Sequence, residues 1–408
     1  MEINEFRLAN GIRLVHHPVN GNVSHCGIFI NAGSRDEKEK EHGLAHFIEH
    51  VIFKGTAKRN VFQVLNRLEN VGADLNAYTS KEDTCIYASF LNPYYDRTLE
   101  LLSDILFHST FPLKELEKEK TVISEEIKSY LDTPSDQIFD DFEDLVFSGH
   151  PLGKNILGTE KSLKKLNRND VLDFVRRNYR TEEMVIVSVG KILFSRLVKI
   201  VSKYFDARVE PGIAAARNSF TSYHPGQKIV KKKIFQVHCI IGGPGYAYGD
   251  DRRIPLALLN NMLGGPVLNS RLSLALRERN GLTYHNESAY TPYSDSGIVS
   301  IYFGTDPVHY DKALHIIHKE LEKLRSRLLT KIQLHTIKNQ LIGQISIAQE
   351  SHLGLMFAIG KNYLVMNRYD PVETVISRIN LTPAEELLEI ARDVFNPGQL
   401  SMLTFQSR

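Results

Sequence analysis

The chain has 408 residues, of which 42% are hydrophobic and 24% charged, and its 50 Lys and Arg nearly balance its 48 Asp and Glu. This is the composition of a folded globular protein, so it excludes disorder as the main state, and the small net charge excludes a global basic field for nucleic acid. The three cysteines are far apart and odd in number, which argues against a disulfide scaffold or a cysteine-based zinc site.

The N-terminus shows no pattern of a targeting segment. Residues 1–6 contain two acidic side chains and no apolar core of signal-peptide length, and they lack the Arg-rich, acid-poor pattern of a transit peptide. No run approaches about 18 consecutive apolar residues, so we expect no membrane span. These features predict a cytoplasmic protein.

The first 190 residues alternate between strand and helix patterns. Predicted strands cover residues 11–16, 26–30 and 184–189, with further alternation over 74–90. Predicted helices cover residues 43–53, 61–71, 96–107, 114–131, 137–147 and 168–178. Strands interleaved with pairs of helices indicate an α+β layered domain.

A break in this pattern follows near residue 209. Residues 209–218 contain Pro and Gly and no clean periodicity, which predicts a linker. The second half then repeats the order of the first, since the helix–turn–strand pattern of 176–187 returns at 391–403. We therefore expect two similar domains. Their predicted ranges are 1–212 for the N-terminal domain, 213–226 for the linker and 227–408 for the C-terminal domain.

The most informative segment is His46-Phe47-Ile48-Glu49-His50, inside the predicted helix 43–53. His46 and His50 lie about one helical turn apart, so both imidazoles can bind one Zn²⁺ from the same face. Glu49 lies on the adjoining face, where it can take a proton from a metal-bound water without ligating the metal. Such a pattern also arises by chance, but here its polar residues interrupt an apolar helix, where buried imidazoles need partners. The residue order is that of the inverzincin motif.

A tetrahedral catalytic zinc needs a third protein ligand. The predicted helix 114–131 offers five carboxylates, from Glu115, Glu117, Glu119, Glu125 and Glu126. Glu119 and Glu126 are seven residues apart and share a face. The pattern alone does not choose among the five, and for most of them a solvated acidic face with lysine partners is the simpler interpretation.

With these motifs in view, the chain resembles the pitrilysin/insulinase family of zinc peptidases. It looks close to the short two-domain members related to the mitochondrial processing peptidase. In that family a ligand Glu follows the inverted motif at the spacing that separates His50 from Glu126 here, and a second Glu lies seven residues before it. The resemblance implies one zinc per chain, held by His46, His50 and Glu126. It also implies Glu49 as general base and Glu119 as outer support that orients a ligand histidine.

The same resemblance implies a LuxS/pitrilysin-like fold, in which each domain is a mostly antiparallel sheet packed with helices. Residues 72–80 resemble the family's active-site edge strand, which can bind an extended peptide through its main chain. The implied substrate-binding residues are Ala73, Asn76, Ala77 and Tyr78.

The second half carries a further match. Family members have an Arg and a Tyr seven residues apart that reach the site in the first domain, and Arg277 and Tyr284 match that spacing. A guanidinium and a phenol can donate hydrogen bonds to a carbonyl oxygen as it becomes an oxyanion. Without the resemblance, the two residues read as a helix-surface charge and a strand residue. The second half has no His-x-x-Glu-His, so we expect one metal site per chain.

These observations predict a zinc metalloendopeptidase that cleaves peptides or unfolded segments, with water activated by zinc and Glu49 as nucleophile. By the resemblance, two such chains form a dimer that encloses a chamber. A homodimer is expected, and a heterodimer with a related subunit stays open.

Two other functions compete with this hypothesis. One is a non-catalytic or assisting subunit of a heterodimeric processing peptidase, although the intact motif favours catalysis. The other is nucleic-acid binding, suggested only by Lys228 and residues 231–233, where a solvated strand edge is the simpler interpretation. We therefore expect peptide substrates and neither nucleic acid nor membrane as partner.

Overall fold

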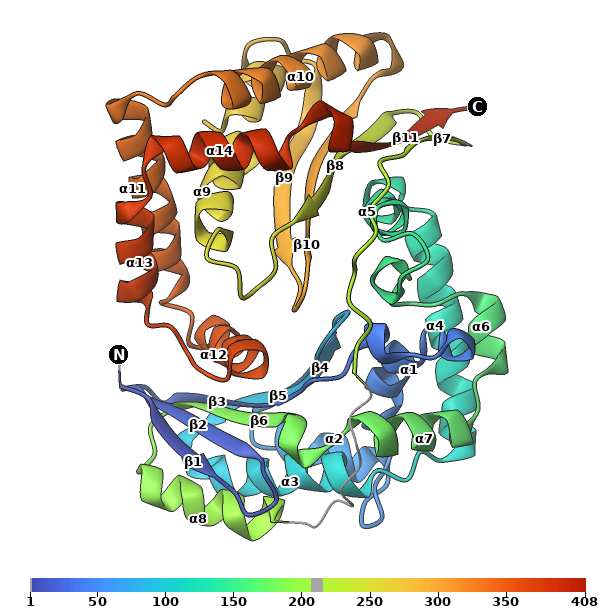
Figure 1. Ribbon diagram of the computed structural model, residues 1–408. Helices are drawn as coiled ribbons and strands as arrows, with labels where there is room; N and C mark the ends of the chain where they lie inside the picture. The colour runs from blue at the N-terminus through green and yellow to red at the C-terminus, as the bar shows by residue number, and fades with distance from the viewer. Residues whose placement is uncertain (1, 207–215) are drawn as a thin grey trace. The chain divides into compact units, whose positions relative to one another are not determined.

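The structure is a computed structural model that describes residues 2–206 and 216–408 (Figure 1). Its residues form two compact units, and each unit takes segments from both halves of the sequence. Unit 1 comprises Met1–Lys128, Lys154–Arg217 and Ile347–Tyr369, and unit 2 comprises Ser129–Gly153, Asn218–Ser346 and Asp370–Arg408. Residues 209–215, on which much of the linker prediction falls, lie outside the described residues, and the domain ranges given above stay a prediction.

Unit 1 is built on a six-stranded sheet within the described residues, in the order β1-β2-β6-β3-β5-β4. Only the pairing of β2 with β6 is parallel. The strands are β1 (Asn4–Arg7), β2 (Arg13–Pro18), β3 (Val23–Ile30), β4 (Asp74–Thr79), β5 (Thr84–Leu91) and β6 (Met184–Gly190). The helices are α1 (Leu44–Val51), α2 (Val61–Glu69), α3 (Tyr95–His108), α4 (Leu113–Leu131), α6 (Glu160–Lys165), α7 (Arg168–Asn178), α8 (Phe194–Phe205) and α12 (His352–Met366).

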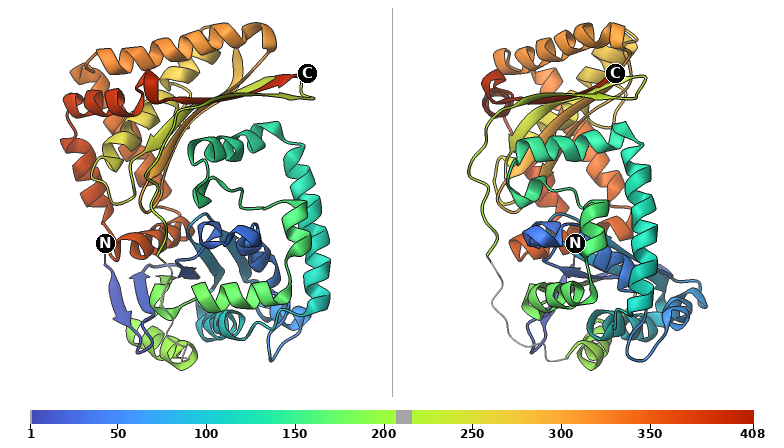
Figure 2. Two further views of the ribbon diagram at one scale, coloured as in Figure 1. Left: turned by 45° about the vertical axis from the view of Figure 1, so that its right-hand side comes forward. Right: turned by 90° about the vertical axis from the view of Figure 1, so that its right-hand side faces the viewer.

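The two faces of this sheet are covered by helices from different halves of the chain (Figures 1 and 2). Alternate strand residues point to opposite faces. Ile28 and Ile186 belong to the apolar cluster that contains α1 and α3. Their neighbours Phe29 and Val185 belong to a second cluster, formed with α12. The sheet is therefore buried on both sides, and one of its covers comes from residues 352–366.

Polar contacts also tie α12 to the sheet. Lys361 forms an ion pair with Asp83, which is buried in the turn between β4 and β5. The Asp83 carboxylate also accepts hydrogen bonds from the hydroxyls of Tyr78, at 2.9 Å, and Ser80, at 2.7 Å. Helix α12 thus holds the turn that follows the edge strand β4.

Unit 2 is built on a five-stranded sheet within the described residues, in the order β7-β11-β8-β10-β9, and only the β7–β11 pairing is parallel. Its strands are β7 (Gln227–Lys232), β8 (Val237–Gly245), β9 (Thr283–Pro292), β10 (Gly297–Thr305) and β11 (Ser401–Ser407). Its helices are α5 (Pro134–Val146), α9 (Arg253–Gly264), α10 (Tyr310–Ser326), α11 (Lys331–Ala348), α13 (Val372–Leu381) and α14 (Ala384–Val394).

The sheet of unit 2 repeats the arrangement of unit 1. Ile240 packs with Ile138 and Phe142 of α5, a helix from the first half of the sequence. Its neighbour Ile241 belongs to the cluster formed with α9, α10 and α14. The prediction of two similar α+β domains with mostly antiparallel sheets is confirmed. Among the described helices, none has the length and apolar content needed to cross a membrane.

Helix α1 is only eight residues long, and a buried carboxylate holds its N-terminus. The Glu37 side chain accepts hydrogen bonds from the backbone N–H groups of Gly43, at 3.0 Å, and Ala45, at 2.8 Å. Gly43 has a φ of 89°, and a Cβ there would meet the Leu157 carbonyl oxygen at 2.8 Å. Burial raises the pKa of Glu37 to about 8, while the two N–H groups and Lys154 favour the carboxylate. Since so short a helix is marginal alone, Glu37 and the core fix its position.

The packing of α12 on the sheet is tested at Gly360, where an added Cβ would meet the ring of buried Phe29 at 2.4 Å. We expect Gly360→Ala to lower the free energy of unfolding by about 1–3 kcal/mol through overpacking. The matched control is Gly343→Ala in α11, where an added Cβ meets nothing within 4 Å. That change should stabilise by roughly 0.4–1 kcal/mol because alanine favours helix. Urea unfolding followed by circular dichroism measures both, and equal effects would contradict the packing described.

The role of Glu37 is tested by Glu37→Ala, which leaves two backbone N–H groups without acceptors. We expect a loss of roughly 1–3 kcal/mol in the free energy of unfolding. Glu39→Ala removes an exposed carboxylate from the same loop and should change stability by no more than about 0.5 kcal/mol. If thermal melting shows the same small effect for both variants, Glu37 does not hold α1.

Candidate metal centre

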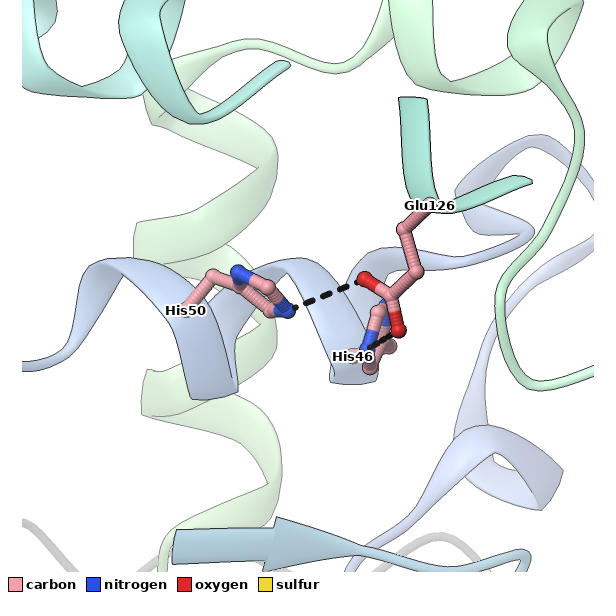
Figure 3. A group of neighbouring side chains, drawn as sticks. All are labelled: His46, His50 and Glu126. Carbon is pink, nitrogen blue, oxygen red and sulfur yellow. Dashed lines mark ion pairs between the residues drawn. The ribbon is translucent and has the colours of Figure 1, made fainter. Parts of the chain in front are cut away.

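Helix α1 presents two histidines on one face, as its four-residue spacing requires (Figure 3). The ring centroids of His46 and His50 are 4.7 Å apart, and the ring planes make an angle of 72°. The opposite, apolar face of α1 is buried in the core of unit 1, through residues such as Phe47 and Ile48. Burial of that face fixes the direction in which the imidazoles point.

Glu126 of α4 brings a carboxylate to the two rings (Figure 3). Its Oε1 lies 3.7 Å from His46 Nε2, and its Oε2 lies 3.4 Å from His50 Nε2. One ligand atom from each of the three side chains lies within 4.8 Å of the others. No second group of at least three His, Cys, Asp or Glu side chains gathers in this way within residues 2–206 and 216–408.

The donor set and its spacing fit a bound zinc ion. Both His–Glu separations exceed the usual hydrogen-bond range of about 2.7–3.2 Å. They are close to the roughly 3.3 Å expected between two atoms that each lie about 2.0–2.1 Å from one tetrahedral zinc. Burial, with His50 nearby, lowers the pKa of His46 to about 4, so this imidazole is neutral at pH 7, as a metal ligand must be.

Glu119, one of the buried residues of α4, orients His50 from its other side. Its Oε2 lies 3.3 Å from His50 Nδ1, and its Oε1 forms an ion pair with Lys54 Nζ at 2.7 Å. A carboxylate on Nδ1 fixes the tautomer that leaves Nε2 free, and Nε2 is the atom that faces Glu126. Glu119 therefore has the geometry of an outer support.

The remaining carboxylates of α4 point elsewhere. Glu115, Glu117 and Glu125 each form an ion pair with a lysine of the same helix, at 2.7–2.8 Å. The structure thus separates the five glutamates that the sequence left open: three have lysine partners on α4, and two lie against the histidines.

Glu49 is half-buried and belongs to the same turn of α1 as His50. Its pKa is raised, mainly by burial and further by the nearby Glu126 carboxylate. A raised pKa makes this carboxylate a better proton acceptor than an exposed glutamate. Glu49 also lies near Thr79, at the end of β4.

Strand β4 is one of the two edge strands of the unit 1 sheet as described, and α1 packs beside it. Ala73 precedes the strand and is buried, as is Ala77, whereas Asn76 is exposed. The ring of Tyr78 packs edge-on against Phe357 of α12, with centroids 5.5 Å apart. Among the described strands, β4 pairs only with β5, so its other edge carries main-chain groups without a strand partner.

Arg277 and Tyr284 lie in unit 2. Arg277 is in the π-helical turn η6 (Ser273–Glu278), and Tyr284 is in β9. The Arg277 guanidinium lies 5.7 Å from the centre of the Tyr284 ring, and Tyr284 is 84% exposed. The pair is therefore formed and accessible, and its part in the chemistry stays a prediction.

Two residues around the site were not predicted as functional. Lys54 follows the motif in Phe53-Lys54-Gly55-Thr56, and its proximity to the motif was the available signal. Glu37 lies before the motif, and its role depends on a loop that folds back onto α1. No periodicity marks such a contact.

The comparisons with known proteins agree with this geometry. Residues 14–160 match the family described as insulinase (peptidase family M16), and residues 165–341 match the peptidase M16 inactive domain. A zinc protease of Bacillus subtilis, YmxG, is 33% identical over 96% of this chain and 96% of its own length. The mitochondrial-processing peptidase subunit beta of Caenorhabditis elegans is 29% identical over 97% of this chain and 87% of its own.

Solved structures share the fold. A protease from Helicobacter pylori has a TM-score of 0.91 at 20% identity and covers 99% of both chains. A peptidase M16 inactive domain from Pseudomonas fluorescens has a TM-score of 0.93 at 18% identity, covering 100% of this chain and 98% of its own. The inverted motif, the two-unit α+β fold and the full-length match agree: this chain belongs to the insulinase family of peptidases, peptidase family M16.

Proposed function

We propose that this chain is a zinc metalloendopeptidase that hydrolyses peptides or unfolded segments. The observation that carries the proposal is the meeting of His46, His50 and Glu126, with Glu49 in the same helical turn as His50. Zinc held by the three side chains would supply Lewis acidity, which makes water a better nucleophile at neutral pH and polarises a peptide carbonyl.

The protein's own residues have distinct parts in this proposal. Glu49 takes a proton from the attacking water and later gives it to the leaving amine, which its raised pKa favours. Glu119 and Lys54 hold the orientation of His50. The free edge of β4, over Asn76 and Ala77, binds the substrate main chain as an added strand. Arg277 and Tyr284 remain the predicted donors to the carbonyl oxygen.

The proposal extends to assembly, with two copies of the chain forming a dimer that encloses the substrate. It is supported by the full-length similarity to a protein whose name describes it as one subunit of a processing peptidase. One chain contains His46, His50, Glu126 and Glu49 together, which supports a homodimer in which each subunit carries a complete set of proposed zinc ligands.

The base is tested by Glu49→Gln, which keeps the side-chain shape but cannot accept a proton. We expect about one zinc per chain to be retained, while hydrolysis of an unstructured fluorogenic peptide falls by at least about 100-fold. Glu69→Gln on exposed α2 is the control and should leave both unchanged. Full turnover in the Glu49→Gln variant would show that Glu49 is not the base. Wild-type protein that takes up no zinc would contradict the proposal that the chain is a zinc enzyme.

The ligand set is tested by three substitutions on α4, with zinc affinity measured by competition against a chelator. Glu126→Gln should weaken zinc binding most, because it changes a ligand. Glu119→Gln should cost about 10–100-fold, as outer supports do. Glu125→Gln, whose partner is Lys128, should have no effect. Equal effects at Glu125 and Glu126 would mean that the third ligand is misassigned.

A further inference from the structure

Unit 2 contains a pocket of about 410 Å³ built from residues other than those of the metal centre. Its walls come from the segment around η6, the end of α10 and the loop that leads to α11. Four lining side chains are cationic: Arg271, Arg279, Lys323 and Arg327. The one carboxylate among the lining residues, Glu320, already forms an ion pair with Lys323. The pocket therefore carries a strong excess of positive charge.

The arginines of this pocket have no direct hydrogen-bond or ion-pair partner in the described part of the chain, although the Glu320 carboxylate lies close enough to Arg271 to interact with its charge. Among the residues that the structure describes, the guanidinium groups of Arg271, Arg279 and Arg327 make no hydrogen bond or ion pair. Arg271 is half-buried, and this burial lowers the pKa of its guanidinium, while the Glu320 carboxylate nearby offsets only part of the effect. Removing a charged group from water without a partner is unfavourable. An oxyanion bound in the pocket would supply the missing partner.

The local backbone aligns two of these arginines. At the C-terminal end of η6, the Arg279 N–H donates to the carbonyl of Leu274, five residues earlier, at 3.1 Å. A π-turn holds about one residue more than an α-turn, so residues four apart across η6 lie close to one face. Arg271, Ala275 and Arg279 have this spacing, and all three line the pocket. Such π-helical turns occur frequently at functional sites, which is a second reason to expect a ligand here.

We propose that this pocket binds an organic phosphate, with Arg271 and Arg279 as its main contacts. Planar guanidinium groups match pairs of phosphate oxygens, and several cations suit a doubly charged oxyanion better than a single carboxylate. Leu274, Leu328 and Leu329 supply an apolar wall for the organic part. The pocket volume lies within the range of about 300–1,000 Å³ that is usual for small-ligand sites.

The test is isothermal titration of the full chain with inorganic phosphate, pyrophosphate and acetate. We expect saturable binding of one pyrophosphate per chain, weaker binding of phosphate, and the weakest binding of acetate. Arg271→Gln should weaken pyrophosphate binding by at least about tenfold. Arg271→Lys should also weaken it, because lysine keeps the charge but lacks the planar guanidinium that binds two phosphate oxygens at once. Lys319→Gln removes an exposed charge from α10 outside the pocket and should bind as the wild type does.

Two further arms complete the test. Arg279→Gln, a change at an exposed position, replaces Arg271→Gln if circular dichroism shows that the latter is unfolded. Co-sedimentation with phosphatidylglycerol vesicles, compared with phosphatidylcholine vesicles, distinguishes a lipid headgroup from a soluble phosphate ester. Binding that depends on Arg271, in the titration or in the co-sedimentation, supports the site. The experiment that shows it tells whether the phosphate ligand is a soluble ester or a lipid headgroup. Absence of saturable binding to millimolar pyrophosphate and to vesicles, or equal affinity in the Arg271 and Lys319 variants, would overturn it.

Discussion

The structure of the candidate centre depends on one constraint: three ligand atoms from two helices must lie within a few ångströms of one another. The four-residue spacing on α1 satisfies it for His46 and His50, since both project from one face. Glu126 satisfies it only if α1 and α4 keep their relative position. Helix α1 has eight residues and little stability of its own, so burial of its apolar face and the Glu37 contacts must hold it.

The positions of the side chains at this site depend on the contacts around them. Glu119 links His50 to Lys54, so the orientation of one imidazole is coupled to a cation just beyond the motif. On the other face of the sheet, α12 covers Phe29 and Val185, and Lys361 holds the turn after β4. The half of the sequence with the motif therefore does not complete its own fold. Without residues 352–366, its sheet would expose an apolar face to water.

The sequence predicted many elements of the first half and the motif, because both depend on local spacing, but it missed α8 (Phe194–Phe205). The helix over 168–178 matches α7, and the helix over 43–53 contains α1. Strand β1 was missed because four residues give too short a pattern, and the first 30 residues hold three strands where two were predicted. The sequence also did not predict that α5 packs in unit 2 and α12 in unit 1, since the apolar face of a helix does not indicate which sheet it covers.

Contacts between side chains far apart in the sequence likewise could not be predicted from the spacing of residues. The pattern offered five glutamates on α4, and only the fold shows that Glu125 faces Lys128 while Glu126 faces His46. The family resemblance chose Glu126 by its spacing from His50, and in the structure this carboxylate lies against both histidines. No such spacing pointed to Glu37, whose contacts depend on a folded loop.

The most direct measurement of the central claim is an anomalous-difference map from crystals of the full chain grown with zinc. The account predicts one strong peak per chain, bound by Nε2 of His46, Nε2 of His50 and a Glu126 oxygen, each at about 2.0–2.2 Å. A peak held by other side chains, or no peak at these three residues in zinc-replete crystals, would contradict it.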